Sequence, residues 1–290
     1  MKVYLQPDTT SRGIMRVVDA LIKYAPPSVE IVSAPEEAEL EIIHAWGRVE
    51  SLGKRIAKIR SEGRKYAMIQ YAIRSTMRPH TKDWIDLWGK AKVVWSYYNL
   101  SHLADEDFVS GDFNFYYAPL GVDEKMFHKL DILGERYKIM ATSQHALAES
   151  VRECAFATKR VGGRMLFVGH ELRRGPDIVC KSHLFDEELA REYSLCDYVS
   201  GLRRTEGFEL PVIEGAMCGA KPIVFDQPHY RKWFNEFAIF IPETDRAGVI
   251  DNLERIFQQA RKQITDSQLN IIRDRFNWSR IINGFWKEVI

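Results

Sequence analysis

The sequence predicts an α/β protein that contains two doubly wound, Rossmann-like domains. Short apolar runs alternate with amphipathic helical segments along most of the 290 residues. This alternation is typical of parallel sheets that are covered by helices on both faces. Two such series occur, and they meet near residues 119–121, so the chain is expected to divide there.

The first series begins with a short apolar strand that ends before Pro7. A helical pattern follows and must end at Pro26 and Pro27, which cannot continue a helix. A second, basic helix stops at Gly63, a residue suited to the left-handed turn after a helix. The expected strands are 2–6, 28–34, 38–46, 65–73, 92–98 and one that starts at 113, and the expected helices are 14–24, 49–62 and 81–91.

The second series has the same alternation. Its expected strands are 137–143, 164–170, 197–202, 221–226 and 238–242, and its expected helices are 145–159, 186–196, 229–237, 245–262 and 266–275. An amphipathic segment closes the chain. We therefore expect an N-terminal domain over 1–118, a C-terminal domain over 119–276, and a final helix over 277–290 that packs back toward the first domain.

The composition is that of an ordinary globular protein, with 46% hydrophobic and 28% charged residues. No apolar run approaches the roughly 18 residues that a membrane span needs, and no apolar stretch follows Lys2 as in a secretory signal. The cysteines are widely spaced, without a C-x-x-C pair: Cys154, Cys180, Cys196 and Cys218. This usage predicts reduced thiols in a cytoplasmic protein.

The segment 206–219, E-G-F-E-L-P-V-I-E-G-A-M-C-G, has a specific physical pattern. It follows an expected strand, Pro211 suits the first position of a helix, and Gly219 suits the position just past its end. The backbone N–H groups at such a helix start can bind an anion, and Gly207 permits close approach. Glu206 before the helix and Glu214 within it could accept hydrogen bonds from hydroxyl groups. The alternative is a capped helix with two incidental carboxylates.

This segment closely resembles the signature of the retaining GT-B glycosyltransferases of family 4, E-G-F-G-L-P-x-x-E-A-M-A-x-G-x-P-V-V. The flanking stretches 117–127, 185–202 and 276–289 are similar to that family as well. The resemblance is good over 117–290 and holds only in outline before it. It implies two Rossmann-like domains that face each other across a cleft, with the acceptor on the compact N-terminal domain.

The resemblance also implies roles for individual residues. Glu206 would be the catalytic residue that holds hydroxyls of the transferred sugar, and Glu214 would hold the ribose of the nucleotide. The other implied donor-binding residues are Gly207, Phe208, Glu209 and Leu210 at the diphosphate, Thr142 and Ser143 after a strand, and Arg12 and Gly13 in an early glycine turn. A simple turn into a helix explains Gly13 equally well.

The chain departs from the family at the diphosphate. The family has G-R-x-x-x-x-K-G where this chain has A-T-S-Q-H over 141–145, so the usual arginine and lysine are missing. Glu209 replaces the second glycine of the signature and would bring a carboxylate near phosphates, which is unfavourable unless it turns away. A displaced arginine could supply the cation, and the candidates are Arg152, Arg203 and Arg204.

The family's N-domain histidine has no clear counterpart, because the corresponding strand offers Gln70 and Tyr71. The nearest strand-end histidine is His44, which we interpret as an acceptor-side residue or as an ordinary histidine at a sheet edge.

Residues 48–92 carry 12 Lys and Arg against 4 Asp and Glu in a chain whose net charge is +1. A positive face in the acceptor domain suggests an anionic acceptor or surface, with Lys54, Arg55 and Lys58 as contacts. One candidate is a membrane surface, with Trp84 and Trp88 as interfacial aromatics. Another is nucleic acid. The plain alternative is a solvated helix face.

The function expected is hexose transfer from a UDP- or GDP-sugar to a hydroxyl acceptor, with retention and without a protein nucleophile. No D-x-D metal signature occurs, so metal-independent transfer without a cofactor is predicted. Two alternatives are a DNA-modifying enzyme that acts on a hydroxylated base, and an inactive module that binds sugar nucleotides or glycans. The expected location is the cytoplasm, or the membrane periphery.

Overall fold

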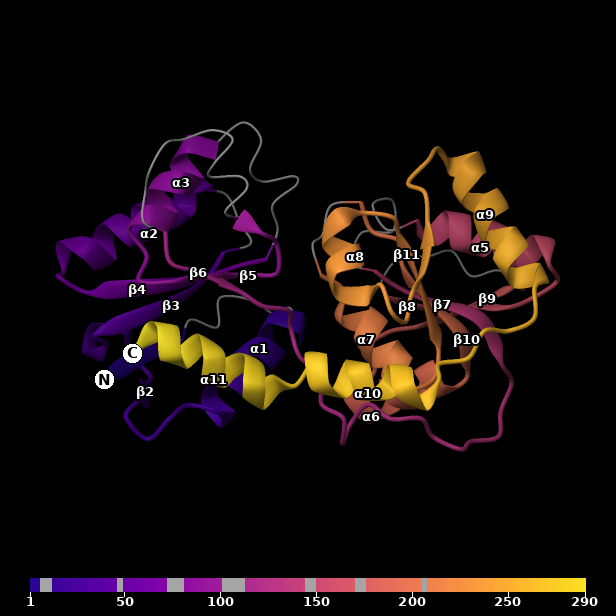
Figure 1. Cartoon of the computed structure of the whole chain (residues 1–290), viewed down its shortest axis with the longest axis horizontal. Helices are drawn as coiled ribbons and strands as arrows, with labels where there is room; N and C mark the ends of the chain where they lie inside the picture. The colour runs from indigo at the N-terminus through magenta and orange to yellow at the C-terminus, as the bar shows by residue number, and fades with distance from the viewer. Residues whose placement is uncertain are drawn as a thin grey trace. The chain divides into compact units, whose positions relative to one another are not determined.

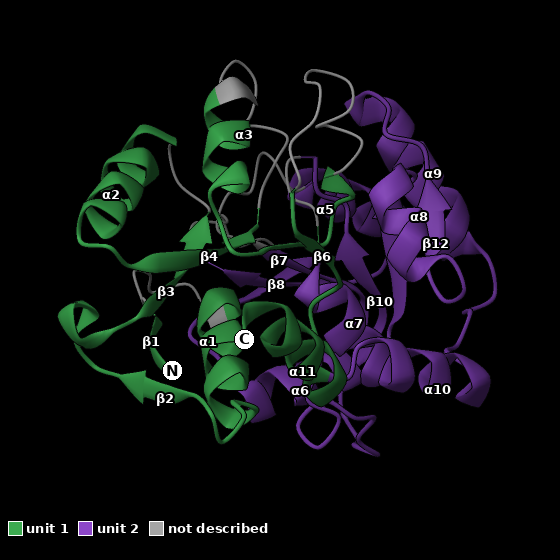
Figure 2. Ribbon diagram, turned by 60° about the vertical axis from the view of Figure 1, so that its left-hand side comes forward, with its two compact units in different colours: residues 1–121, 205–208, 278–290 green, residues 122–204, 209–277 purple. Residues whose placement is uncertain are grey.

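The computed structural model describes residues 1–5, 12–45, 49–71, 81–100, 113–143, 150–169, 176–204 and 208–290. The chain forms two compact units (Figure 2). Unit 1 contains residues 1–121, 205–208 and 278–290, and unit 2 contains residues 122–204 and 209–277. Each unit is therefore assembled from segments that are distant in the sequence.

Unit 1 has a parallel sheet with the strand order β2-β1-β3-β4-β5-β6 (Figure 1). Its strands are β1 (Lys2–Leu5), β2 (Glu30–Val32), β3 (Leu40–Ala45), β4 (Lys65–Gln70), β5 (Val94–Ser96) and β6 (Phe115–Tyr117). The chain moves from β1 to one side for β2 and to the other for β3. This reversal beside β1 is the topological switch point of a doubly wound sheet.

Helices cover both faces of this sheet, with α1 (Arg12–Lys23) and α11 (Trp278–Val289) on one face and α2 (Val49–Ser61) and α3 (Thr81–Gly89) on the other (Figures 1 and 2). The C-terminal helix α11 belongs to the core of unit 1. The Trp286 indole Nε1 donates to the backbone oxygen of Leu21 at 3.3 Å, and Phe285 packs against Trp95 with ring centroids 5.3 Å apart. Burial of these aromatic rings fixes the end of the chain on the first domain.

Unit 2 has a second parallel sheet with the order β12-β11-β10-β7-β8-β9. Its strands are β7 (Tyr137–Ser143), β8 (Met165–Gly169), β9 (Ile178–Lys181), β10 (Cys196–Gly201), β11 (Lys221–Phe225) and β12 (Ile239–Ile241). Helices α5 (Val151–Arg160) and α9 (Arg246–Gln258) pack on one face, and α6 (Asp186–Ser194), α7 (Leu210–Met217) and α10 (Asp266–Arg275) lie on the other (Figure 1). The short helix α8 (Pro228–Phe234) links β11 to β12.

The two parallel sheets with helices on both faces confirm the predicted fold class. The final helix, predicted over 277–290, is α11 of unit 1. Two elements have no counterpart in the prediction, namely the edge strand β9 and the 3-10 helix η1 (Pro35–Glu37). The β9 segment contains Cys180 and Lys181 next to only two strongly apolar residues, so its pattern is weak. No helix within the described residues is long and apolar enough to cross a membrane.

Candidate functional site

The start of α7 lies where the sequence predicts an anion site. Strand β10 ends at Gly201, and α7 begins at Leu210 with Pro211 in its first turn. Gly219 follows the helix with φ +90°, a left-handed conformation that favours glycine. The backbone N–H groups at the beginning of α7 and the helix dipole favour a negative ligand there. Glu206 and Gly207, the predicted catalytic residue and its neighbour, lie outside the described residues.

Gly201 and Gly215 let α7 pack closely on the sheet. A Cβ atom on Gly201 would lie 2.5 Å from Val212 Cγ2, and one on Gly215 would lie 2.8 Å from Val199 Cγ1. Both distances are too short for real side-chain carbons. These two glycines therefore set the separation between α7 and β10, and with it the position of the helix start at the carboxyl edge of the sheet.

Glu209 is the N-cap residue of α7, and its side chain turns into the protein. It is 1% exposed. The Tyr230 hydroxyl donates to its Oε1 at 3.1 Å, and Arg203 Nε lies 2.7 Å from its Oε2. A buried carboxylate requires such partners, because burial of an uncompensated charge is costly. The departure from the family glycine thus adds a carboxylate that is already paired.

Arg203 connects the ends of two strands. It follows β10, and its Nη2 donates to both the backbone oxygen and the hydroxyl of Thr142, each at 3.1 Å. Thr142 is the penultimate residue of β7. The predicted donor residues Thr142 and Glu209 are therefore joined through Arg203, beside the start of α7. Ser143, another predicted donor residue, ends β7.

Arg204 and Arg152, the other candidate cations, have different environments. The Arg204 guanidinium lies 5.0 Å from the ring centroid of Phe225, and its Nη1 is 4.0 Å from Glu243 Oε1. Arg152 is exposed in the first turn of α5. Neither residue shares the Arg203 contacts with β7.

Glu214 lies on α7 and is 2% exposed. The Tyr193 hydroxyl on α6 donates to Glu214 Oε2 at 3.4 Å. Burial, and secondarily the charge of Glu214, raises the pKa of Cys218. Leu210, which begins α7, is also buried. The proposed contact of Glu214 with a ribose stays a prediction.

Phe208 and Gly13, both predicted donor residues, belong to unit 1. Phe208 is buried, and its ring lies against that of Tyr97 with centroids 5.6 Å apart. Gly13 and Arg12 form the start of α1. The Phe208 side chain is thus fixed by packing. That its backbone faces the diphosphate of a donor stays a prediction.

His44 lies at the carboxyl end of β3 and is 4% exposed. Its Nδ1 is 2.8 Å from the Tyr71 hydroxyl, and the two rings are stacked. Burial, together with the positive charge of Arg55, lowers the pKa of His44 to about 4. Burial also raises the pKa of Tyr71 well above 10. Both rings are therefore neutral near pH 7, and the buried His44 pairs with the half-buried Tyr71 at the carboxyl edge of the sheet.

Two arginines of the basic stretch 48–92 stabilise the fold of unit 1 by pairing with a buried glutamate. Arg55 Nε donates to Glu41 Oε1 at 2.7 Å, and Arg64 Nη1 donates to Glu41 Oε2 at 2.9 Å. Glu41 is 1% exposed on the central strand β3, so both arginines neutralise a buried charge. Lys54 and Lys58 are exposed on α2. The sequence reasoning missed this use of Arg55, although an acidic residue inside an apolar strand is a visible signal for it.

The interpretation of Trp84 and Trp88 as interfacial aromatics is wrong. Trp84 is 0% and Trp88 1% exposed in unit 1. The Trp88 indole donates to Gln70 Oε1 at 3.3 Å and packs edge-on against Phe115. Their helical spacing places both rings on the face of α3 that covers the sheet, where burial of a large aromatic surface is most favourable.

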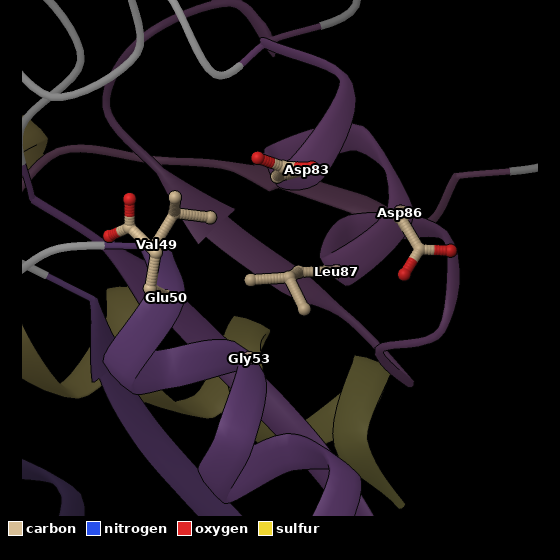
Figure 3. A pocket seen from close by; sticks show the side chains of 6 residues that line it. All are labelled: Val49, Glu50, Gly53, Asp83, Asp86 and Leu87. Carbon is tan, nitrogen blue, oxygen red and sulfur yellow. The ribbon is translucent and has the colours of Figure 1, made fainter.

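A pocket of about 310 Å³ lies between α2 and α3 (Figure 3). Its lining residues are Val49, Glu50, Gly53, Asp83, Asp86 and Leu87. Three of these six described residues are carboxylates, and one of them, Asp86, pairs with Lys90 of the same helix.

Metal-ligating residues do not gather in the described part of the chain: no group of three or more His, Cys, Asp or Glu there could hold a metal ion. All four cysteines are free thiols, and Cys154, Cys196 and Cys218 are buried. Burial raises the pKa of Cys154 to about 12, so this thiol is unreactive near neutral pH.

No family model matches the chain, and no curated protein matches it. Solved structures do match, at low sequence identity. Sucrose-phosphate synthase from Thermosynechococcus elongatus is 14% identical, with a TM-score of 0.70, and the alignment covers 99% of this chain and 97% of that one. A glycosyltransferase from Rickettsia africae is 13% identical, with a TM-score of 0.65 over 99% of this chain and 96% of that one.

A third structure is a variant of S. aureus TarM in complex with fondaparinux, alpha-GlcNAc-glycerol and UDP. It is 12% identical, with a TM-score of 0.65 over 86% of this chain and 55% of that one. The first two of these matched chains align with this one over almost their whole length, so the fold built on the two six-stranded sheets is similar to theirs. The protein described here has the GT-B fold.

Proposed function

We propose that this chain is a retaining glycosyltransferase that moves a hexose from a UDP- or GDP-sugar to a hydroxyl group of an acceptor. The observation that carries the proposal is the segment 206–219, which matches a family 4 signature and runs from the end of β10 into α7 of a GT-B fold. Ligands of doubly wound sheets bind at the carboxyl ends of the strands, and α7, the described helix of this segment, begins at that edge.

The proposed chemistry follows from the residues of the segment. The bond between the sugar carbon and the diphosphate oxygen breaks, the acceptor oxygen bonds to that carbon from the same face, and the acceptor proton passes to the departing diphosphate. Glu206 orients the sugar hydroxyls, Glu214 receives the ribose hydroxyls, and the first turn of α7 stabilises the diphosphate charge. A protein nucleophile is not required for this course.

The donor test uses calorimetric binding of UDP- and GDP-hexoses, followed by measurement of UDP or GDP release with and without simple sugar acceptors. We expect binding in one nucleotide series and slow hydrolysis of that donor. Glu206→Ala should reduce turnover by at least about 100-fold, the scale of losing a group that stabilises the transition state. Glu254→Ala, which removes a half-buried carboxylate of α9 that pairs with Arg160 and accepts from Gln258, is the matched control. Unchanged turnover in Glu206→Ala contradicts the site.

For the acceptor, we propose an anionic molecule or surface that reaches Lys54 and Lys58 of α2, which are exposed. Binding to a heparin or DNA column that weakens as salt is raised would favour a nucleic-acid acceptor. A hydroxylated base in a duplex would then have to be flipped out to reach the donor. Binding to anionic vesicles instead would favour a membrane-associated acceptor. The double variant Lys54→Glu with Lys58→Glu should abolish either interaction. Column or vesicle binding that survives both changes would show that this face of α2 is not the acceptor surface.

An inactive sugar-nucleotide or glycan binding module is the alternative class. Its motivation is the absence of the family's arginine and lysine from 141–145. Donor binding without turnover over a broad acceptor panel would favour the module over the enzyme.

A further inference from the structure

Arg203 occupies a position at the carboxyl edge of the unit 2 sheet that no sequence signature assigns. Its guanidinium contacts Glu209 at the start of α7 through Nε, at 2.7 Å, and Thr142 near the end of β7 through Nη2, at 3.1 Å. Because the guanidinium is planar, contacts on two different edges fix both its place and its orientation.

Glu209 is itself fixed from the other side. The buried Tyr230 hydroxyl donates to Oε1 at 3.1 Å. The Cγ atom of Glu209 lies 3.6 Å from the point where a Cβ atom on Gly201 would stand. The Glu209 side chain therefore passes beside the end of β10, and its carboxylate has Tyr230 on one oxygen and Arg203 on the other.

The other cations on these central strands lie at the opposite end of the sheet. Lys138, near the beginning of β7, is 3.2 Å from Asp197 Oδ2, and Asp197 is near the beginning of β10. Arg136 and Arg261 pair with the same aspartate. At the carboxyl edge, the described residues that follow β10 include both Arg203 and Arg204. Arg203 pairs with Glu209 and reaches Thr142, whereas Arg204 lies beside Phe225 and Glu243.

We propose that Arg203 binds the diphosphate of the donor, and that Glu209 and Tyr230 are positioning residues that hold its guanidinium for this task. The proposal rests on the proposed function and assigns the cation that the signature lacks. The Arg203 side chain keeps 12% of its surface exposed, so a ligand can reach it. Because the guanidinium is already held in place, it loses little freedom when it binds phosphate oxygens. The two departures from the family, a lost cation and a gained carboxylate, then compensate each other.

The test compares UDP and GDP with uridine and guanosine, which lack the phosphates. Arg203→Gln should weaken binding of the nucleoside diphosphate by about 10-fold or more, the scale of a charge-assisted hydrogen bond, and leave nucleoside binding unchanged. Glu209→Gly, which restores the family glycine, should weaken diphosphate binding as well. Glu209→Gln keeps hydrogen-bonding oxygen at the site and should lose less than Glu209→Gly. Glu236→Gln, at an ion pair with Arg275, is the matched control.

If the Glu209 carboxylate only repelled phosphate, its removal would strengthen diphosphate binding. Tighter binding by Glu209→Gly or Glu209→Gln therefore overturns the proposal. Unchanged diphosphate affinity in folded Arg203→Gln does the same. If thermal unfolding shows that Arg203→Gln is unfolded, Tyr230→Phe removes one contact of Glu209 and should weaken diphosphate binding about 2- to 5-fold, and an unchanged affinity overturns the proposal. Wild-type protein that binds neither UDP nor GDP overturns the proposed function too, whereas binding that is independent of Arg203 overturns this inference alone.

Discussion

Gly215→Ala is expected to destabilise the protein although alanine is the better helix former. Gly215 lies inside α7, where replacing glycine by alanine would by itself stabilise the helix by about 0.5–1 kcal/mol. The new Cβ atom would stand 2.8 Å from Val199 Cγ1, 2.9 Å from Val199 Cβ and 3.1 Å from Tyr193 Cδ1. All three atoms are buried, so α7 or β10 must shift by roughly 1 Å to restore normal contact distances.

The expected net effect follows from the two terms. Overpacking of a dense core costs about 1–3 kcal/mol, and the helix preference returns about 0.5–1 kcal/mol. From the middle of both ranges, we therefore expect the free energy of unfolding to fall by about 1 kcal/mol. Gly53→Ala is the matched control, because Gly53 also lies inside a helix, α2, and a Cβ atom there meets nothing within 4 Å. That change should raise the free energy of unfolding by about 0.5–1 kcal/mol.

Urea unfolding of the wild type and both variants measures these effects through the midpoint and the slope. Val199→Ala combined with Gly215→Ala should cost less than the sum of the two single changes, because it removes the Cγ1 atom that the new Cβ meets. A Gly215→Ala protein that is as stable as the wild type refutes the reasoning, since the close approach of α7 to β10 would then be unnecessary. The same variant should also weaken donor binding if the start of α7 holds the diphosphate.

Three further predictions concern stability and the reaction. Glu41→Ala should lower the free energy of unfolding by about 3–5 kcal/mol in denaturant titrations, because Arg55 and Arg64 lose their buried partner; a loss below 1 kcal/mol would show that water replaces it. His44 has a pKa of about 4 in the folded state, so the unfolded chain binds the extra proton below about pH 6.5 and stability should fall by up to about 3 kcal/mol as the pH drops toward 4. His44→Gln should flatten that part of the plot of unfolding free energy against pH. An unchanged slope would show that other groups cause the loss of stability. EDTA should leave sugar transfer unchanged, and loss of turnover that Mg²⁺ or Mn²⁺ restores would contradict metal independence.

Much of the fold could be predicted because its signals are local. Pro26 and Pro27 must end a helix wherever the rest of the chain lies, and the apolar run of β4 has few alternatives to a buried strand. The strand β9 was missed because its four residues are only half-buried and carry no alternation. Trp84 and Trp88 were misassigned for a related reason. A helical aromatic stripe looks the same whether it faces a lipid surface or a sheet, and only the packing of α3 decides between them.

The candidate site shows where sequence reasoning must stop. The residue types along 141–145 and 206–219 indicate a missing cation and an unwelcome carboxylate, and each appears as a separate defect in donor binding. In the folded unit these features meet, because Glu209 pairs with Arg203 and Arg203 contacts Thr142. A residue six positions before the α7 N-cap thus reaches β7, 61 positions earlier in the chain, through one guanidinium. Contacts over that sequence separation depend on strand order, so a single sequence cannot reveal that the two departures belong together.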